Sequence, residues 1–407
     1  MQFSGASSIG RLSKAQPMSL DLKSPRSLAP CELVTFKIEG LGAEFVMPLG
    51  KGQSLEHQFQ AYLKGIQSEH LSEDCGKIAE SLLNKKVWQV SPEPSKPRVG
   101  VLMNDLFQLG ESKRATLFGP IQRTGCQPVV ILPMVFHRPE LSREASFKLM
   151  NQVSQSLDGV LAPGGEDLDP KTYGASSRGS LRTHLDRDRS DMAFALGAIA
   201  GRKAYISAIC RSHQMINALL GGDMIQDVQA EGYSSIDRHQ THHGIDGRQP
   251  FVLKEGGRKV FEHLVTLKPG SQIQQSASVG EWLTNSRHHQ AVKTPGIGLE
   301  VSAHTTDPGT GKRLVEGTQG TAIITCQFHP EDMSYDEKAM RHVDIVGRRA
   351  QMIHHVKQLK SHKMPIHRST LESWMQAKTQ GGARLFQPSD YQWLNQGGFD
   401  FLQAMPV

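Results

Sequence analysis

One cysteine of the chain stands where a buried strand is expected to turn directly into a helix. The apolar run 204–209 ends at Cys210, and an amphipathic helical pattern begins at once with Arg211. A thiol at such a turn meets backbone N–H groups and the positive end of the helix dipole, and both favour the reactive thiolate. This placement is typical of an enzymatic nucleophile, although composition alone favours a buried structural cysteine. Context must decide between the two interpretations of Cys210.

A histidine and a carboxylate follow a second expected strand at short spacing. The segment 326–331 reads Cys-Gln-Phe-His-Pro-Glu, so Glu331 comes two residues after His329. Glu331 can orient and charge-stabilise the imidazole while the imidazole takes a proton from a thiol. On its own, this spacing is also what an ordinary surface histidine would show. Cys326 is expected to be a core residue of the strand.

A pair of glycines, Gly164 and Gly165, directly follows the expected strand 159–162. Backbone without side chains can approach a ligand closely and present N–H donors to it. Alone, the segment is an ordinary loop. Together with the cysteine and histidine segments, it points to chemistry at one edge of a sheet.

Short apolar runs, each followed by a helical stretch, provide the elements that would position these residues. This alternation predicts parallel βα units and an α/β fold. Ser190 is expected to cap a helix with Met192, Leu196 and Ile199 on one face. A second helix over 211–220 is expected to stop at the Gly221-Gly222 pair. Strands are expected at 98–103, 128–132, 159–162, 204–209, 251–253 and 321–327, and a last long helix at 335–360.

The ends of the chain differ in composition from this central region. Runs at 33–38 and 43–47 predict a β-hairpin that turns on glycines, and a helical pattern follows over 55–83. Three prolines within 91–97 mark the expected domain boundary. Aromatic residues in the tail 361–407 argue that it docks onto the body or a partner. We therefore expect a mobile leader at 1–30, a small α+β extension at 31–97, a catalytic domain at 98–350 and a tail at 351–407.

Composition and charge exclude several classes of protein. The 407 residues carry 46 basic and 40 acidic side chains, a net charge of +6 that is too dispersed for a nucleic-acid surface. No apolar run approaches the roughly 20 residues that span a membrane. Five cysteines without a Cys-x-x-Cys pair, and no secretory signal pattern, favour a reducing, cytoplasmic setting. No phosphate-binding or dinucleotide fingerprint is present, so we expect chemistry without a cofactor.

Six segments, in this order along residues 98–349, resemble the class I glutamine amidotransferase-like superfamily. The resemblance is strongest to its γ-glutamyl hydrolase branch, the peptidase C26 family, and implies a flavodoxin-like, mostly parallel sheet flanked by helices. The matching segments are Gly-Gly-Glu-Asp-Leu-Asp-Pro-Lys-Thr-Tyr (164–173), Arg-Asp (187–188), Ile-Cys-Arg-x-x-Gln (209–214), Leu-Gly-Gly (220–222), Asn-Ser-Arg-His-His-Gln-Ala (285–291) and Gln-Phe-His-Pro-Glu (327–331).

The resemblance implies roles for individual residues of this chain. Cys210 would be the nucleophile of a triad, His329 its base and then acid, and Glu331 the residue that orients the imidazole. The backbone N–H groups of Gly165 and Arg211 would form the oxyanion hole. A γ-glutamyl amide would be cleaved through a thioester, with release of glutamate. The residues that would hold the γ-glutamyl group are Gly164, Gln214, His288, His289 and Gln290.

Two positions depart from the family pattern, which usually has glycine two before and two after the nucleophile. Here they are Ala208 and Ser212, and a Cβ at each place is expected to add strain or narrow the pocket. The 18 histidines of the chain include adjacent pairs, but no zinc-binding motif accompanies them, so no metal is expected. The segment 239–243 either lines the pocket or forms a solvated loop.

Three functions remain open on the sequence alone. The first is a γ-glutamyl hydrolase that acts on a small amide or a conjugate. The second is a glutaminase subunit that supplies ammonia to a separate synthase. The third is a binding or regulatory protein that reuses the scaffold and engages a protein partner through residues 1–97 or 361–407. The triad residues favour an enzyme, whereas the fold alone would not.

Overall fold

The computed structural model of the chain describes most of its length. Within the described part, no helix combines the length and the apolar character needed to cross a bilayer. The expected leader 1–30 and the histidine-rich segment 239–243 lie outside the described residues. The described ranges are 31–68, 73–103, 106–136, 141–233, 251–253, 259–379 and 385–406.

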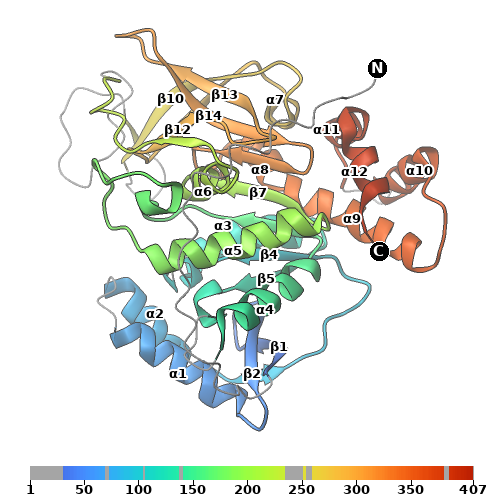
Figure 1. The fold of residues 1–407 in the computed structure, drawn as a ribbon. Helices are drawn as coiled ribbons and strands as arrows, with labels where there is room; N and C mark the ends of the chain where they lie inside the picture. Colours follow the sequence, from blue (N-terminus) through green and yellow to red (C-terminus); the bar gives the residue numbers. More distant parts are fainter. Residues whose placement is uncertain are drawn as a thin grey trace.

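The fold is built on one sheet whose six central strands run parallel (Figure 1). Nearly all side chains of the four innermost strands are buried, because helices cover both faces of the sheet. The predicted α/β fold is thus confirmed, and so are the strands expected at its centre. In order across the sheet they are β15 (Ile323–Cys326), β7 (Tyr205–Ile209), β6 (Gly159–Ala162), β4 (Arg98–Leu102), β5 (Gln127–Ile131) and β2 (Glu44–Gly50).

Two pairs of helices cover the parallel strands (Figure 1). On one face, α4 (Arg143–Gln155) packs along α5 (Leu185–Gly201). On the other face, α3 (Glu111–Arg123) contacts α9 (Ile345–Ser361), and α9 also contacts β4, β6 and β7. The parallel strands therefore lie in the middle of a three-layer arrangement.

Two helix boundaries differ from the sequence predictions. Ser190 lies inside α5 and its hydroxyl donates to a backbone carbonyl at 2.6 Å, so the predicted cap is wrong. The helix is capped instead by His184, whose Nδ1 accepts a backbone N–H at 3.1 Å. The long helix expected over 335–360 is interrupted at Asp344, between α8 (Glu337–Val343) and α9.

The N-terminal part of the described chain adds a hairpin to the edge of the parallel strands. β1 (Cys31–Ile38) pairs antiparallel with β2, and β2 pairs in parallel with β5. Gly40 and Gly42 in the turn have φ values of +78° and +65°, which glycine adopts without strain. The predicted hairpin is confirmed, while the domain boundary at 91–97 stays a prediction. The other elements here are α1 (Leu55–Ser68), α2 (Glu73–Leu83) and β3 (Val87–Gln89).

Antiparallel strands continue the sheet beyond β15. β14 (Arg313–Gly320) pairs with β15 and is followed by β13, β10 and the edge strand β11. Of all the strands in this antiparallel arm, the sequence patterns predicted only the strand at 251–253, which pairs with β10. The loop after β11 leads back toward the carboxyl ends of the parallel strands, so this arm contributes to the site described below. Its elements are β8 (Asp223–Ile225), β9 (Phe251–Leu253), β10 (Lys259–Leu267), α7 (Gln272–Ala277), β11 (Glu281–Ser286), β12 (Ala291–Thr294) and β13 (Glu300–Thr306).

The C-terminal aromatic residues dock onto the body, as the sequence predicts. Trp393 is 1% exposed, and its Nε1 donates to the Thr321 carbonyl at 2.7 Å. The guanidinium of Arg349 lies 4.2 Å from the Trp393 ring centroid. Arg348 and Arg349, both on α9, share the carboxylate of Asp390 at 2.9 and 2.6 Å. The tail consists of α10 (Arg368–Thr379), α11 (Pro388–Trp393), η6 (Leu394–Gly398) and α12 (Phe399–Ala404).

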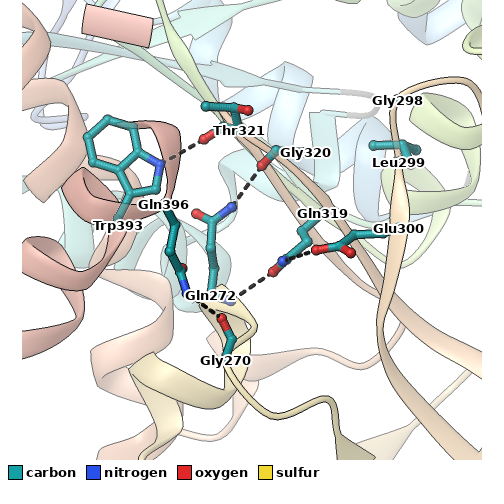
Figure 2. Close-up of a pocket in the computed structure, with 10 residues that line it drawn as sticks. All are labelled: Gly270, Gln272, Gly298, Leu299, Glu300, Gln319, Gly320, Thr321, Trp393 and Gln396. Carbon is teal, nitrogen blue, oxygen red and sulfur yellow. Dashed lines mark hydrogen bonds between the residues drawn. The ribbon is translucent and has the colours of Figure 1, made fainter. Parts of the chain in front are cut away.

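A pocket of about 580 Å³ lies where this tail meets the amino-terminal end of β15 (Figure 2). Gln272 donates its amide to the Gly320 carbonyl at 2.8 Å, and its backbone N–H donates to Gln319 Oε1 at 2.7 Å. The Gln319 amide in turn donates to Glu300 at 2.6 Å. Because these polar groups bond to one another, the pocket is best described as the junction between the tail and the sheet.

Replacing Asp390 by alanine is expected to lower the free energy of unfolding by roughly 3–5 kcal/mol, because two buried guanidinium groups would lose their common carboxylate. Chemical denaturation measures the change. Asp400→Ala on the exposed side of α12 is the matched control and is expected to cost less than about 0.5 kcal/mol. Equal destabilisation by the two substitutions would contradict the structural role assigned to Asp390.

Candidate active site

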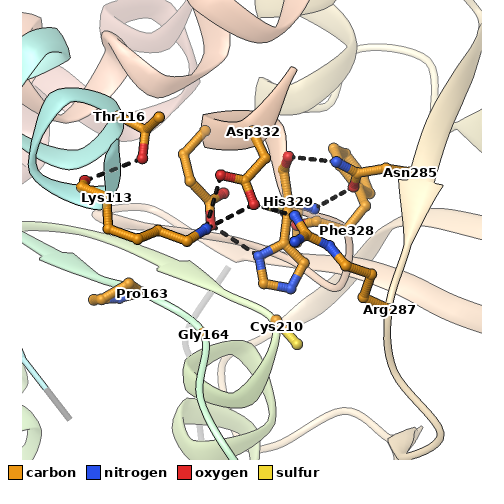
Figure 3. Close-up of polar contacts among 12 residues, drawn as sticks. Lys113, Thr116, Pro163, Gly164, Cys210, Asn285, Arg287, Phe328, His329 and Asp332 are labelled. Carbon is orange, nitrogen blue, oxygen red and sulfur yellow. Dashed lines mark hydrogen bonds and ion pairs between the residues drawn. The ribbon is translucent and has the colours of Figure 1, made fainter. Parts of the chain in front are cut away.

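The carboxyl ends of β6, β7 and β15 bring the three chemically suggestive segments together (Figure 3). Cys210 lies between β7 and α6 (Arg211–Leu219). The predicted strand-to-helix turn is thus confirmed. The φ of Cys210 is +51°, which is uncommon for a residue with a side chain, and such strain concentrates at functional sites. The backbone N–H of Cys210 donates to the Cys326 carbonyl at 2.8 Å, which ties the turn to the next strand.

The His329 ring and the Cys210 side chain both lie against Gly164. A Cβ built on Gly164 would lie 2.7 Å from His329 Cε1 and 3.2 Å from Cys210 Cβ, so only glycine fits between them. The other side of the ring bonds to Glu331, with 2.8 Å between Nδ1 and Oε1. Burial disfavours the imidazolium, but the negative charges of Glu331 and a Cys210 thiolate outweigh it and raise the pKa of His329 to about 9. The structure thus brings together the thiol, the imidazole and the carboxylate that the sequence pointed to.

Asn285 holds the backbone of His329 in place. Its side-chain amide donates to the His329 carbonyl and its Oδ1 accepts the His329 N–H, both at 2.8 Å. The sequence places Asn285 in a family-like segment but gives no sign of this role. Because both bonds reach the backbone, Asn285 can fix the position of the ring without bonding to its nitrogens.

The expected oxyanion donors belong to the two loops that face each other across the site. Arg211 is the first residue of α6, where a backbone N–H has no partner within the helix. Its side chain points away into a buried ion cluster, with Nη1 2.8 Å from Asp191 and Nη2 bonded to Asp188. In the glycine loop opposite, the Gly164 carbonyl accepts a hydrogen bond from the side chain of Gln108, which follows β4, at 2.8 Å. This bond fixes the peptide plane that carries the Gly165 N–H.

Removing the Gln108 amide is expected to loosen that peptide and weaken oxyanion stabilisation. Gln108→Leu should lower kcat about tenfold while KM changes less than threefold, since one positioning bond and no oxyanion donor is lost. Steady-state kinetics on any turned-over substrate provide the measurement. A rise in KM with unchanged kcat would instead assign Gln108 to substrate binding.

The two departures from glycine are accommodated without blocking the turn. Ser212 donates its hydroxyl to the Pro163 carbonyl at 2.6 Å, which joins the nucleophile helix to the glycine loop. Ala208 is fully buried in β7, beside Ala162 and Thr325 of the neighbouring strands. The expected cost of a Cβ at position 212 is therefore offset by a hydrogen bond that glycine cannot make.

Ser212→Ala is expected to destabilise the fold by roughly 0.5–1.5 kcal/mol, because the buried hydrogen bond between the Ser212 hydroxyl and the Pro163 carbonyl is lost. The thermal unfolding midpoint should fall accordingly. Ser361→Ala, which removes an exposed hydroxyl from the end of α9, is the control. A Ser212→Ala protein as stable as the wild type would remove the stabilising role given to this bond.

Gln214 is buried one helical turn after the nucleophile. Its amide donates to the Gln290 carbonyl at 3.0 Å and to Gln327 Oε1 at 3.1 Å. Gln327 in turn donates to the Cys210 Sγ at 3.6 Å. Gln214 therefore supports a side chain that touches the thiol, and its expected contact with substrate stays a prediction.

The side chains of His288, His289 and Gln290 bond to different parts of the site. His288 is buried and its Nδ1 donates to the Gln290 carbonyl at 2.8 Å, whereas His289 Nε2 lies 2.7 Å from Asp167 in the loop after β6. The Gln290 amide donates to the Ser180 hydroxyl at 2.8 Å. These bonds tie the antiparallel arm to the glycine loop. The predicted role of these residues in substrate binding is left as a prediction.

A buried acid–base cluster lies behind the nucleophile helix. One oxygen of the fully buried Glu316 lies 3.2 Å from His263 Nε2 and 3.8 Å from His288 Nε2. Burial lowers the pKa of His213 to about 3 and that of His288 to about 4, so both rings are neutral near neutral pH. Against the effect of burial, the charge and hydrogen bond of His263 lower the pKa of Glu316. No sequence pattern indicated this grouping.

One group of described residues could bring metal-ligand atoms together. A ring nitrogen of His329 and carboxylate oxygens of Glu331 and Asp332 lie within 4.8 Å of one another. However, Lys113 Nζ lies 2.8 Å from both oxygens of Asp332, and Arg287 also pairs with it. Two cations on one carboxylate fit ion pairing better than binding of a further cation.

Comparison with known proteins agrees with these observations. A protein-family model described as peptidase C26 matches residues 118–331, which include the glycine loop, Cys210, His329 and Glu331. Protein PB2B2.05 of Schizosaccharomyces pombe, which carries the name of a glutamine amidotransferase, is 29% identical over 214 residues, covering 52% of this chain and 71% of its own. Protein NtpR of Enterococcus hirae is 28% identical over 192 residues, covering 46% of this chain and 72% of its own.

Solved structures resemble the chain more distantly. The glutaminase domain of Trypanosoma brucei CTPS with bound acivicin aligns with a TM-score of 0.39 at 16% identity. The alignment covers 63% of this chain and 94% of that domain.

Proposed function

Since the chain belongs to the peptidase C26 family, we propose that it is a cysteine-dependent hydrolase that cleaves a γ-glutamyl amide and releases glutamate. The observation that supports this most strongly is that the His329 ring and the Cys210 side chain both lie against Gly164, while His329 Nδ1 bonds Glu331 at 2.8 Å. A nucleophile, an imidazole and an orienting carboxylate in contact are the parts that thiol acyl transfer requires. The family resemblance supplies the γ-glutamyl specificity of the proposal.

The first half-reaction forms a thioester. With a pKa of about 9, His329 is protonated near neutral pH, and its positive charge favours attack by Cys210 as a thiolate. The thiolate of Cys210 attacks the amide carbonyl, and the backbone N–H groups of Gly165 and Arg211 stabilise the oxyanion. As the C–N bond breaks, His329 gives its proton to the leaving amine. Glu331 keeps the imidazole oriented throughout.

The second half-reaction releases glutamate. His329, now neutral, takes a proton from water as the oxygen attacks the thioester carbonyl. The same backbone donors stabilise the second tetrahedral oxyanion. When the C–S bond breaks, Cys210 leaves as a thiolate and His329 is again an imidazolium. The cycle therefore consumes one water and needs no other reactant.

A screen for released glutamate tests this proposal. The substrates are glutamine, γ-glutamyl amines, γ-glutamyl peptides and glutamylated protein, and Cys210→Ser provides the blank. Release from amines or peptides supports the hydrolase. Turnover of glutamine alone would favour a glutaminase subunit, and no release from any substrate would favour a binding protein on the same scaffold.

We also propose a cytoplasmic location and a protein partner that contacts residues 1–97 or 361–407. The free thiols of Cys31, Cys126, Cys210 and Cys326 support a reducing setting. Truncation is unsuitable for testing such a partner, because removing residues 351–407 would uncover the core around Trp393. Exposed substitutions in the full chain are therefore the appropriate variants for a pull-down, and unchanged capture by all of them would argue against a partner at these ends.

A further inference from the structure

A side-chain amide meets the sulfur of Cys210 from the neighbouring strand. Gln327 directly follows β15, and its Nε2 donates to Cys210 Sγ at 3.6 Å. Gln327 is fully buried, and its backbone N–H donates to the Glu316 carbonyl at 2.8 Å. The contact with the thiol therefore comes from a side chain that the framework of the site holds in place.

Two further residues set the orientation of this amide. The Gln290 backbone carbonyl can only accept a hydrogen bond, so the atom of Gln214 that meets it at 3.0 Å is the nitrogen Nε2. The same nitrogen donates to Gln327 Oε1 at 3.1 Å. Since the oxygen of Gln327 is thus turned toward Gln214, its N–H group and not its carbonyl faces the thiol. The bonds from Gln290 through Gln214 therefore present a donor to the sulfur.

A donor at this place distinguishes the ionised sulfur from its neutral forms. The sulfur of a thiol or a thioester is a weak acceptor, whereas a thiolate carries a full charge, and charge strengthens a hydrogen bond roughly twofold. The amide therefore favours the thiolate before attack. It does so again when the C–S bond of the thioester breaks and the electron pair stays on sulfur. The amide keeps its protons in both steps, so the cycle gains no further proton transfer.

The charged and titratable groups around the thiol act on it separately from this amide. His329 and Arg287 interact with the charge of Cys210 from the loops after β15 and β11, and Cys326 does so from β15 itself. Burial raises the pKa of Cys326 well above its ordinary value, so this thiol stays neutral. A substitution of Gln327 leaves all three groups in place, and its effect on Cys210 can therefore be measured by itself.

From these contacts we infer that Gln327 is a further catalytic residue, which donates a hydrogen bond to the Cys210 thiolate before attack and to the departing thiolate in the second half-reaction. Gln214 acts as a positioning residue that keeps the donor turned toward the sulfur. This role is additional to the substrate contact that the sequence predicts for Gln214. The inference rests on the proposed function, in which Cys210 is the nucleophile, but it concerns the state of the sulfur and not the choice of substrate.

The rate at which iodoacetamide alkylates Cys210, followed by peptide mass spectrometry, tests the inference without any substrate. Gln327→Met keeps a similar volume but cannot donate, so the rate near pH 7 should fall about tenfold. Near pH 10, where the thiol ionises in either protein, the two rates should agree within about threefold. A thiol that is merely displaced would stay slow at every pH. For glutamate release near pH 7, kcat/KM should fall by about the same factor as alkylation.

Two further variants keep the test decisive. Gln319→Met removes a buried amide at the amino-terminal end of β15, and its Cys210 should be alkylated at the wild-type rate. Gln327→Asn keeps an amide that is one methylene too short to reach the sulfur, so it should lose the same rate even if the methionine variant fails to fold.

Two results would overturn the inference while the hydrolase function stands. One is a wild-type rate of alkylation near pH 7 in a folded Gln327 variant, and the other is a loss that persists near pH 10. Absence of glutamate release by the wild type would instead overturn the proposed function, and the alkylation rates would still decide whether Gln327 activates the thiol.

Discussion

Replacing Cys210 by serine is expected to reduce glutamate release by at least about a thousandfold, to the level of the screen's blank. The serine hydroxyl is not ionised near neutral pH, so it cannot form the thiolate–imidazolium pair that the raised pKa of His329 favours. The side chains differ little in volume, and the turn should keep its geometry. Continuous assay of glutamate with the best substrate of the screen measures the loss.

Two controls separate loss of the nucleophile from loss of the fold. Cys31→Ser, in a strand at the far end of the sheet, should retain wild-type kcat/KM. Iodoacetamide should label Cys210 ahead of the other four cysteines of the wild-type chain. Activity of Cys210→Ser comparable to that of Cys31→Ser would contradict the assignment of the nucleophile, and so would equal labelling of all five thiols.

Replacing Glu331 by glutamine is expected to lower kcat roughly a hundredfold to ten-thousandfold. The amide can still meet His329 Nδ1, whose carboxylate partner lies at 2.8 Å in the wild type, but it cannot stabilise the imidazolium by charge. The comparison with Glu337→Gln, an exposed carboxylate at the start of α8, controls for a general change of charge. Loss of less than about tenfold would show that orientation of His329 does not depend on Glu331.

The pH dependence of the same variant gives a second readout. In the wild type, His329 is protonated below its pKa of about 9, so kcat/KM should fall as pH rises through about 9. Glu331 is a main cause of that raised value, and its replacement should therefore move the alkaline limb to lower pH. If kcat/KM of Glu331→Gln fell at the same alkaline pH as that of the wild type, a group other than His329 would control the alkaline loss of activity.

The parallel core of the fold was predictable because its strands are buried on both faces. Continuous apolar runs such as Val129 to Leu132 leave little choice of element, and proline and glycine mark their limits. The antiparallel arm was not predictable in the same way. β14 buries Glu316 and Thr318, and β11 buries Thr284 and Asn285, so their polar residues conceal the strand pattern.

The positions of Cys210, His329 and Glu331, which we propose as the triad, were predictable because they follow expected strands and the His329-to-Glu331 spacing is local. Their supports were not, because they come from distant parts of the chain. Gln108 meets Gly164 across 56 positions, and Lys113 meets Asp332 across 219. Only folding brings such pairs together, and a single sequence contains no local pattern that announces them.

The ion pair of Arg287 with Asp332 illustrates the same limit. Arg287 lies within a segment whose resemblance to the family suggested only a lining role for its neighbours. Its pairing with Asp332, and the position of both beside His329, depend on the loop after β11 reaching the end of β15. The local segment indicated where the site is, whereas the ion pair of Arg287 with Asp332 exists only in the folded chain.

The most direct test of the account is to trap the acyl-enzyme. After rapid acid quenching with a γ-glutamyl substrate, intact-protein and peptide mass spectrometry should find one glutamyl group, carried by the peptide that contains Cys210, and none in Cys210→Ser. The same quench should show the group disappearing as glutamate is released. Glutamate release without any glutamyl adduct on Cys210, or an adduct on another residue, would contradict the proposed thioester mechanism.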